Sequence, residues 1–184
     1  MSLNKLTSQF QAALAEAQSL AIGRDHAFIE PIHLMKALIT QDNGTVKPLL
    51  AQASVNVTQL LADLDQEIDR LPTVEAAKPG EIYPSPHLIQ LLNVADKFAQ
   101  QRKDEYLSSE LFVLAAVEDK DKLGRLLKKA GAVKSMLEQS IQAIRGGESV
   151  SDPAAEGRRR ALEKYTIDLT EQAAKRKIRS RHWS

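Results

Sequence analysis

The chain of 184 residues contains no cysteine, which excludes a disulfide scaffold, a thiolate zinc site and a cysteine nucleophile. Aromatic residues make up only 4% of the sequence, whereas alanine, leucine and glutamine are abundant, and this composition favours helices over sheets. The sequence also lacks the run of about 20 apolar residues that a membrane-spanning helix needs, and Met1 to Phe10 shows no secretory signal. We therefore expect a cytoplasmic protein with no membrane partner.

Motifs for catalysis and for cofactor binding are missing as well. None of the eight glycines lies in the phosphate-binding pattern G-x-x-x-x-G-K-[ST] or in the dinucleotide-binding pattern G-x-G-x-x-G. The four histidines do not have the H-E-x-x-H spacing of a zinc site, and there is no G-x-S-x-G nucleophile motif. The sequence thus predicts a chain that is not an enzyme and that binds no cofactor or metal ion.

The charges are unevenly distributed along the chain. From Arg158 onward there are nine basic and three acidic residues, which leaves the preceding part with a net charge of −5. A mildly acidic body is not typical of a nucleic-acid-binding surface, so we expect no nucleic-acid partner there. Only the basic end, with Trp183 as a stacking ring, offers an alternative site for single-stranded nucleic acid.

Apolar residues recur at steps of three and four over most of the chain, which predicts amphipathic helices. Asn56 with Gln59 resembles a capping box, Ser85 precedes a proline at a first helical position, and Gly146 follows a last turn. The predicted helices cover about 6–21, 31–39, 46–53 and 56–71, and then, after a break rich in proline and glycine, about 86–99, 108–117, 123–129 and 133–145.

The second group of four helices repeats the pattern of the first. With an offset of 78 residues, Phe10 matches Leu88 and Leu14 matches Leu92, and further along the offset falls to 77. We therefore expect an all-α fold in which two pseudo-twofold-related four-helix repeats, about 3–71 and 85–147, pack as one domain over 1–147. Residues 148–160 are predicted to be a flexible linker, and a short C-terminal helix is predicted to follow over 161–174.

Equivalent positions in the two repeats differ in polarity or size, and the second repeat has the more apolar or larger residue each time. The surplus apolar surface either packs against the first repeat or forms a shallow groove for extended peptide segments, with Asp104 and Glu110 at its rim. The sequence leaves both alternatives open. The pairs are Gln11 and Ile89, Ala13 and Leu91, Glu16 and Val94, His33 and Leu111, and Lys36 and Leu114.

Four longer motifs resemble a known family. The run Phe28-Ile-Glu-Pro-Ile-His-Leu-Met35 and the run Ser108-Ser-Glu-Leu-Phe-Val-Leu-Ala-Ala116 resemble the paired repeats of the Clp amino-terminal domain. The segments 145–150 and 161–170 resemble, more narrowly, the ClpB-type protein disaggregases, in which they form the linker and the start of the first ATPase module.

The resemblance implies a non-catalytic domain that engages unfolded or aggregated proteins for a hexameric, ATP-driven ring, with this fragment itself a monomer. An alternative is a docking platform for an adaptor or another partner protein. In the family the substrate is bound in an apolar groove with polar residues around it. The positions that match this surface here are Thr7, Leu91, Val94, Asp104, Glu110 and Leu111.

The tail departs from the family pattern. Residues 161–184 are interpreted as the remnant of an ATPase module with an aberrant basic end, because Arg-Ser-Arg-His-Trp-Ser follows Ile178 where the family has Asp-Pro-Val-Ile-Gly-Arg. One extra base after the Ile178 codon would cause this change, so we hypothesise a frameshift in the gene or in a cloned version. The alternative is a natural short form whose basic tail binds an acidic partner.

Overall fold

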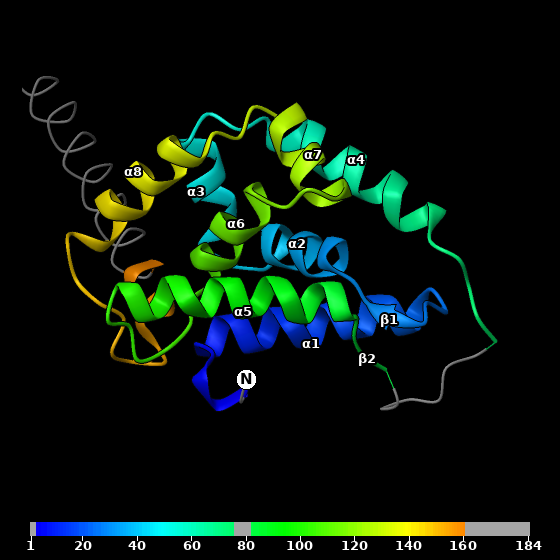
Figure 1. The fold of residues 1–184 in the computed structure, drawn as a ribbon, viewed down its shortest axis with the longest axis horizontal. Helices are drawn as coiled ribbons and strands as arrows, with labels where there is room; N and C mark the ends of the chain where they lie inside the picture. Colours follow the sequence, from blue (N-terminus) through cyan, green and yellow to red (C-terminus); the bar gives the residue numbers. More distant parts are fainter. Residues whose placement is uncertain (1–2, 76–81, 161–184) are drawn as a thin grey trace, which may run out of the picture.

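The structure, a computed structural model, describes residues 3–75 and 82–160 and confirms the all-α fold with two four-helix repeats (Figure 1). The short helix predicted over 161–174, and the remnant interpretation of 161–184, lie outside the described residues. A 3₁₀ helix, η1 (Leu3–Lys5), precedes the first repeat, which consists of α1 (Ser8–Gly23), α2 (Pro31–Thr40), α3 (Val46–Gln52) and α4 (Val57–Arg70). The second repeat consists of α5 (Pro86–Gln101), α6 (Ser109–Val117), α7 (Lys122–Lys129) and α8 (Lys134–Arg145).

Three of the helices begin where the side chain of the preceding residue accepts a hydrogen bond from a first-turn backbone N–H. Thr7 caps α1 by accepting a hydrogen bond from the N–H of Phe10, and Ser85, its equivalent in the second repeat, accepts one from the N–H of Leu88. Asn56 caps α4 in the same way, at 3.0 Å from the N–H of Gln59. The predicted capping box is only half formed, because the N–H of Asn56 donates to the carbonyl of Ala130 at 2.8 Å, while the Gln59 amide donates to Asp63.

In each repeat, the segment in front of the first helix binds to the other repeat. The N–H of Thr7 donates to the carbonyl of Leu107 at 3.0 Å, and the N–H of Ser85 donates to the carbonyl of Ile29 at 2.9 Å. Two short parallel strands, β1 (Phe28–Ile29) and β2 (Tyr83–Pro84), result from the second of these contacts. The segment in front of each first helix is thus held by the loop in front of the other repeat's second helix. This crossed pairing ties the repeats into one domain.

The core lies around the second helix of each repeat. All residues of α6 are buried, and α2 is buried except at Lys36 and at its last residue, Thr40. Figure 1 shows α2 and α6 between the pair α1 and α5 on one side and α3, α4, α7 and α8 on the other. Phe10 of α1 and Phe112 of α6 meet edge to face, with ring centroids 6.1 Å apart. Buried aliphatic side chains provide the main stabilisation of this arrangement.

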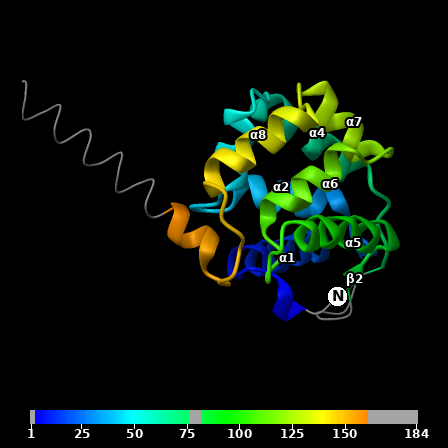
Figure 2. The ribbon, with the colours of Figure 1, turned by 60° about the vertical axis from the view of Figure 1, so that its left-hand side comes forward.

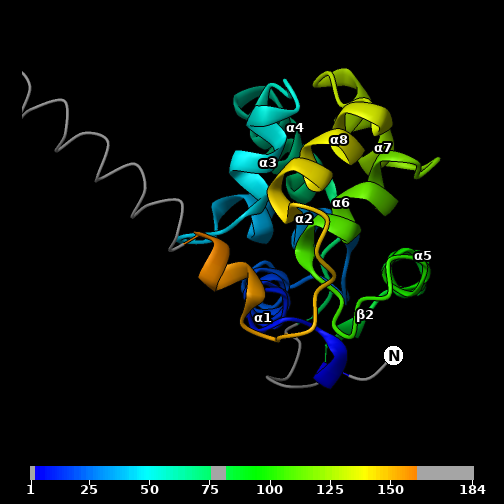
Figure 3. The same cartoon turned by 90° about the vertical axis from the view of Figure 1, so that its left-hand side faces the viewer.

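Residues 148–160, which we call the strap, are docked on the domain, so the prediction of a flexible linker was wrong. The N–H of Val150 donates to Asp104 at 2.9 Å, the N–H of Glu105 donates to the carbonyl of Val150 at 2.8 Å, and the N–H of Ser8 donates to the carbonyl of Pro153 at 2.9 Å. The strap runs beside α1, and residues 155–160 are helical (Figures 2 and 3).

The strap is docked because the second repeat forms a contact that the first repeat also forms. In the first repeat the segment after α4 binds in a similar place, since the N–H of Val74 donates to the carbonyl of Asp25 at 2.8 Å. The strap is the second repeat's version of that segment and belongs to the fold. Its polar composition suggested a solvated linker because composition does not reveal that these polar groups have buried partners.

Candidate functional site

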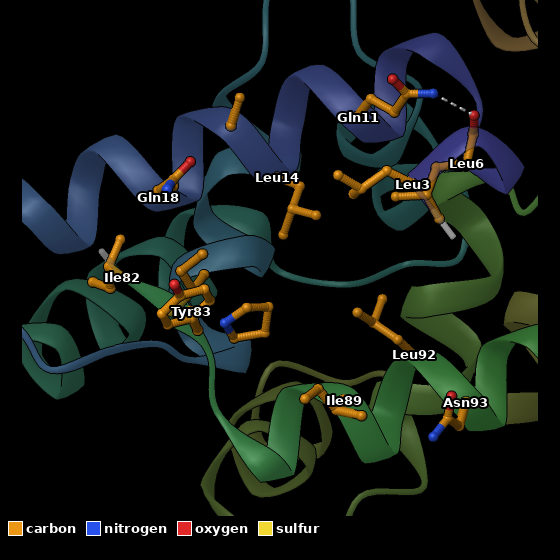
Figure 4. A pocket seen from close by; sticks show the side chains of 13 residues that line it. Leu3, Leu6, Gln11, Leu14, Gln18, Ile82, Tyr83, Ile89, Leu92 and Asn93 are labelled. Carbon is orange, nitrogen blue, oxygen red and sulfur yellow. Dashed lines mark hydrogen bonds between the residues drawn. The ribbon is translucent and has the colours of Figure 1, made fainter. Parts of the chain in front are cut away.

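A cavity of about 570 Å³ lies between the first helices of the two repeats, and we call it the groove. Gln11, Leu14 and Gln18 of α1 line one side of it, and Ile89, Leu92 and Asn93 of α5 line the other (Figure 4). The spacing of each set matches one face of a helix. Leu3 and Leu6 close one end of the groove, while Ile82, Tyr83 and Pro84 form the other.

The repeat places equivalent residues on opposite sides of the groove. Leu14 and Leu92 occupy the same position in their repeats and both extend into the cavity in Figure 4. Gln11 and Ile89 are also equivalent, and they are a pair that the sequence comparison singled out for its difference in polarity. The groove therefore lies between the two related helices, with an apolar α5 side and a more polar α1 side.

The described residues that line the groove are mostly apolar and carry no charge. Its rim exposes large apolar side chains, with 66% of Tyr83, 61% of Leu3 and 47% of Ile89 accessible to solvent. Among the described residues that line it, the polar side chains are amides apart from the phenol of Tyr83, and none is charged. The Gln11 amide donates to the carbonyl of Leu6 at 2.9 Å. Such a site can bury apolar side chains of an extended segment without selecting its charge.

Leu91, Val94 and Leu111 do not form the exposed surface expected from the sequence. Leu91 is 5% accessible and Leu111 is fully buried, so both side chains pack inside the domain. The reason is that α5 packs against α6 and also contacts α2, which covers a wider stripe of α5 than one helix neighbour would. Val94 is half-buried at the edge of the core. The apolar residue of α5 that faces solvent is Ile89.

Thr7, Asp104 and Glu110 do not form a charged rim, because all three bind the strap or the end of α8. Arg145 donates from Nη1 to Oδ1 of Asp104 at 3.0 Å and from Nε to Oε1 of Glu110 at 3.1 Å. Arg159 of the strap lies 3.2 Å from the same Glu110 oxygen. Burial alone would raise the pKa of the Glu110 carboxyl, but the guanidiniums of Arg159 and Arg145 outweigh burial and hold that pKa below its usual value.

Glu156 is a central polar residue that the sequence analysis missed. Its carboxylate is 1% exposed and accepts hydrogen bonds from the hydroxyls of Thr7 and Thr45 and from the N–H of Ser109. Burial and the negative charge of the neighbouring Glu110 raise the pKa of the Glu156 carboxyl. No local pattern marks this residue, since its partners lie at three distant places in the chain.

Residues 5–130, more than half of the chain, match the family model described as "Clp repeat (R) N-terminal domain". The chain belongs to this family. It is 49% identical to the chaperone protein ClpB of Vibrio cholerae over 178 residues, and 46% identical to that of Pseudomonas putida. These alignments cover 97% of this chain but only 21% of the first relative, so the chain spans about a fifth of the length of the relatives it matches.

Solved structures share the fold of this Clp N-domain. The Hsp104 N-terminal domain from Candida albicans has a TM-score of 0.71 at 24% identity, and the match covers 83% of this chain and 99% of that one. A complex of the ClpV N-domain with a VipB peptide has a TM-score of 0.62 at 24% identity, covering 80% and 91%. The Clp repeat domain that this chain comprises lacks an ATPase module.

A second buried polar cluster of the Clp N-domain lies at the start of α2. Nδ1 of His26 and Nε2 of His33 are 2.8 Å apart, and Nδ1 of His33 accepts the N–H of Glu30 at 2.8 Å. Burial, together with His26 and Arg24, lowers the pKa of His33 to about 4. Within residues 3–75 and 82–160, no group of three or more histidine or acidic side chains is arranged to hold a metal ion. No helix in the same ranges has the length and apolarity for a membrane crossing.

Proposed function

We propose that this Clp N-domain binds exposed apolar segments of unfolded or aggregated proteins in the groove, as the substrate-engaging domain of an ATP-dependent disaggregase. The observation that carries the proposal is an open, uncharged groove whose rim exposes Leu3, Tyr83 and Ile89 to solvent. Large exposed apolar side chains around a concave site are typical of surfaces that bind other proteins. Affinity from apolar burial demands little of a partner's sequence, which suits diverse clients.

Two similarities support this function. Relatives at up to 49% identity are ClpB chaperones, and a ClpV N-domain of the same fold has been solved in complex with a peptide. The chain spans about a fifth of the length of those relatives. Assembly into a hexameric ring and ATPase activity are therefore also proposals. We also propose that the protein is located in the cytoplasm.

The six residues that the resemblance implies divide into two groups. For Leu91 and Val94 of α5 and Leu111 of α6 we propose a supporting role, in which the packing of α5 against α6 and α2 holds the groove face of α5 in position. For Thr7, Asp104 and Glu110 we propose that the contact with the strap fixes the start of α1. Direct contact with a client is assigned to groove residues, foremost Ile89 and Tyr83.

The test is a fluorescence-anisotropy titration of the 184-residue chain with labelled, reduced and carboxymethylated α-lactalbumin, a permanently unfolded protein. Ile89→Ser and Tyr83→Ser should each weaken binding about tenfold, since losing about 1.4 kcal/mol of apolar contact corresponds to a factor of ten. Because none of the described side chains that line the groove is charged, raising the salt concentration should leave the affinity unchanged.

The matched control is Val133→Ser. Val133 is 49% exposed, similar to Ile89, but lies at the start of α8 and does not line the groove. It should leave binding unchanged. Equal binding by the wild-type chain and the two groove variants would refute the proposal that the groove binds clients. A loss confined to Val133→Ser, with a folded partner as the better ligand, would favour the adaptor-docking alternative, because Met136 is exposed beside Val133 on α8.

A further inference from the structure

The strap is held by a cradle built from both repeats. One carboxylate oxygen of Glu156 accepts hydrogen bonds from the Thr7 hydroxyl and, at 3.2 Å, from the N–H of Ser109, while the other accepts the Thr45 hydroxyl at 2.9 Å. Thr7 and Thr45 are the residues in front of α1 and α3, and Ser109 is the first residue of α6. A single side chain of the strap thus fixes the starts of three helices.

The cradle is directly connected to one wall of the groove. Thr7 follows Leu6, which lines the groove, and the next residue, Ser8, donates its N–H to the carbonyl of Pro153 in the strap at 2.9 Å. The chain from Leu3 to Ser8 is therefore fixed by the strap at one end and forms the groove's end wall at the other (Figure 4). If the strap leaves, the contact of Thr7 with Glu156 and that of Ser8 with Pro153 are lost, and the wall loses this support.

The charges around Glu156 make the docking of the strap depend on pH. Glu110 of α6 repels it, while Arg145 at the end of α8 and Arg159 in the strap neutralise Glu110, and Asp104 binds Arg145 in turn. Burial and Glu110 raise the pKa of Glu156, so the docked strap favours the protonated carboxyl. Docking is then strongest below the ordinary pKa of glutamate and weakens as the pH rises toward the raised value, because ionising Glu156 in the cradle costs free energy.

We propose that the strap is a detachable clamp on the groove, so that docking of Glu156 in the cradle and binding of an apolar segment in the groove strengthen each other. The proposal rests on the function proposed above for the groove. Because coupling free energies are reciprocal, a bound segment should also hold the strap more firmly on the domain. Release of the strap would open the end wall and let the segment go.

Hydrogen exchange on the 184-residue chain tests the clamp without any ligand. Glu156→Ala removes the acceptors of three donors, so the protection of the Ser8 and Glu105 amides, which donate to strap carbonyls, should fall about tenfold or more. Glu148→Ala is the control, since Glu148 is an exposed glutamate of the same segment, and should change neither amide. The amides of Phe112 and Leu38 in the core report whether the variant remains folded. Unchanged protection of Ser8 and Glu105 in a folded Glu156→Ala variant would overturn the clamp.

Binding to a labelled, acetylated peptide of alternating leucine and serine tests the coupling. Glu156→Ala should bind it several-fold more weakly than the wild-type chain, and adding the peptide to the wild-type chain should slow exchange at Ser8. If exchange speeds up in Glu156→Ala while peptide affinity stays the same, the coupling is refuted and the groove function stands. If the wild-type chain does not bind the peptide, the groove function and the coupling both fail, and the exchange data still report on the strap.

Glu156→Gln separates hydrogen bonding from charge. The amide keeps an acceptor for Thr7 and Ser109 and offers a donor to Thr45, but it does not titrate. Strap protection in this variant should match the wild-type value at acidic pH and remain there at neutral pH, whereas wild-type protection should decline over that range. An identical pH dependence of the two proteins would show that another group controls docking.

Discussion

Nη1 of Arg145 lies 3.0 Å from Oδ1 and 2.8 Å from Oδ2 of Asp104, with 6% and 0% of the two side chains accessible to solvent. The same guanidinium also donates to Glu110 and to the hydroxyl of Ser108 at 2.8 Å. It therefore joins the end of α8 to the start of α6 and to the loop after α5. A buried arginine with this many partners is costly to remove, because its carboxylates would remain buried without a cation.

Arg145→Met should lower the free energy of unfolding by about 3–5 kcal/mol, the usual effect of removing one partner from a buried ion pair. Arg158→Met is the comparison, since Arg158 pairs with Asp152 at 2.8 Å but is 65% exposed. That change should cost less than about 1 kcal/mol. Urea unfolding monitored by circular dichroism measures both, and equal effects would contradict the buried network.

Leu111→Ala should destabilise the domain by about 2–5 kcal/mol, because Leu111 is fully buried in α6 and the substitution leaves a cavity. Ile89→Ala should cost less than about 1 kcal/mol, since Ile89 is 47% exposed at the groove. The same urea experiment applies. A nearly neutral Leu111→Ala variant with weakened client binding would instead support direct contact of Leu111 with clients.

Gly124→Ala should be destabilising although alanine favours helices. A Cβ atom at Gly124 would lie 1.8 Å from the carbonyl oxygen of Asp119, so the start of α7 would have to move, at a cost of about 3 kcal/mol. Gly23→Ala at the end of α1 meets no atom within 4 Å and should be neutral or stabilising by about 0.5 kcal/mol. Thermal melting of the two variants distinguishes the cases, and similar melting temperatures would refute the close approach.

The domain should lose stability on acidification through the pair His26 and His33. Burial lowers the pKa of both rings, that of His33 from 6.5 to about 4, so the unfolded chain binds protons more readily than the folded one between these values. This loss of unfolding free energy is absent above pH 6.5, grows as the pH falls, and is complete near pH 4. Its full size is no more than about 3 kcal/mol. His33→Leu, which copies Leu111 of the second repeat, should show a shallower decline in urea unfolding across this range. An unchanged slope would assign the decline to other groups.

The helices and the repeat were predictable because they depend on local patterns. Asn56 precedes an apolar stripe and caps α4, and the residue pairs at an offset of 78 place Thr7 and Ser85 in equivalent caps. The groove was partly predictable, since the pair Gln11 and Ile89 lines it. Comparing the two repeats identified positions that differ in polarity. It did not identify all of the residues that face solvent.

The burial of Leu91 and the docking of the strap could not be predicted from local patterns. An apolar residue beside the core stripe of α5 is buried or exposed according to how many helices cover it, and α6 and α2 both contact α5. Glu156 looks like a solvated glutamate until Thr7, Thr45 and Ser109 are brought around it. Such long-range encounters carry no periodic signal in the sequence.

The crossed pairing of Thr7 with Leu107 and of Ser85 with Ile29 has a consequence for the history of the fold. A half-length chain with one repeat would lack the loop that holds its leading arm, so it should not be a stable monomer. A second copy of the same half would supply that loop, and two copies would exchange arms across a true twofold axis. Duplication and fusion of the gene for such a homodimer would produce the geometry of the present chain.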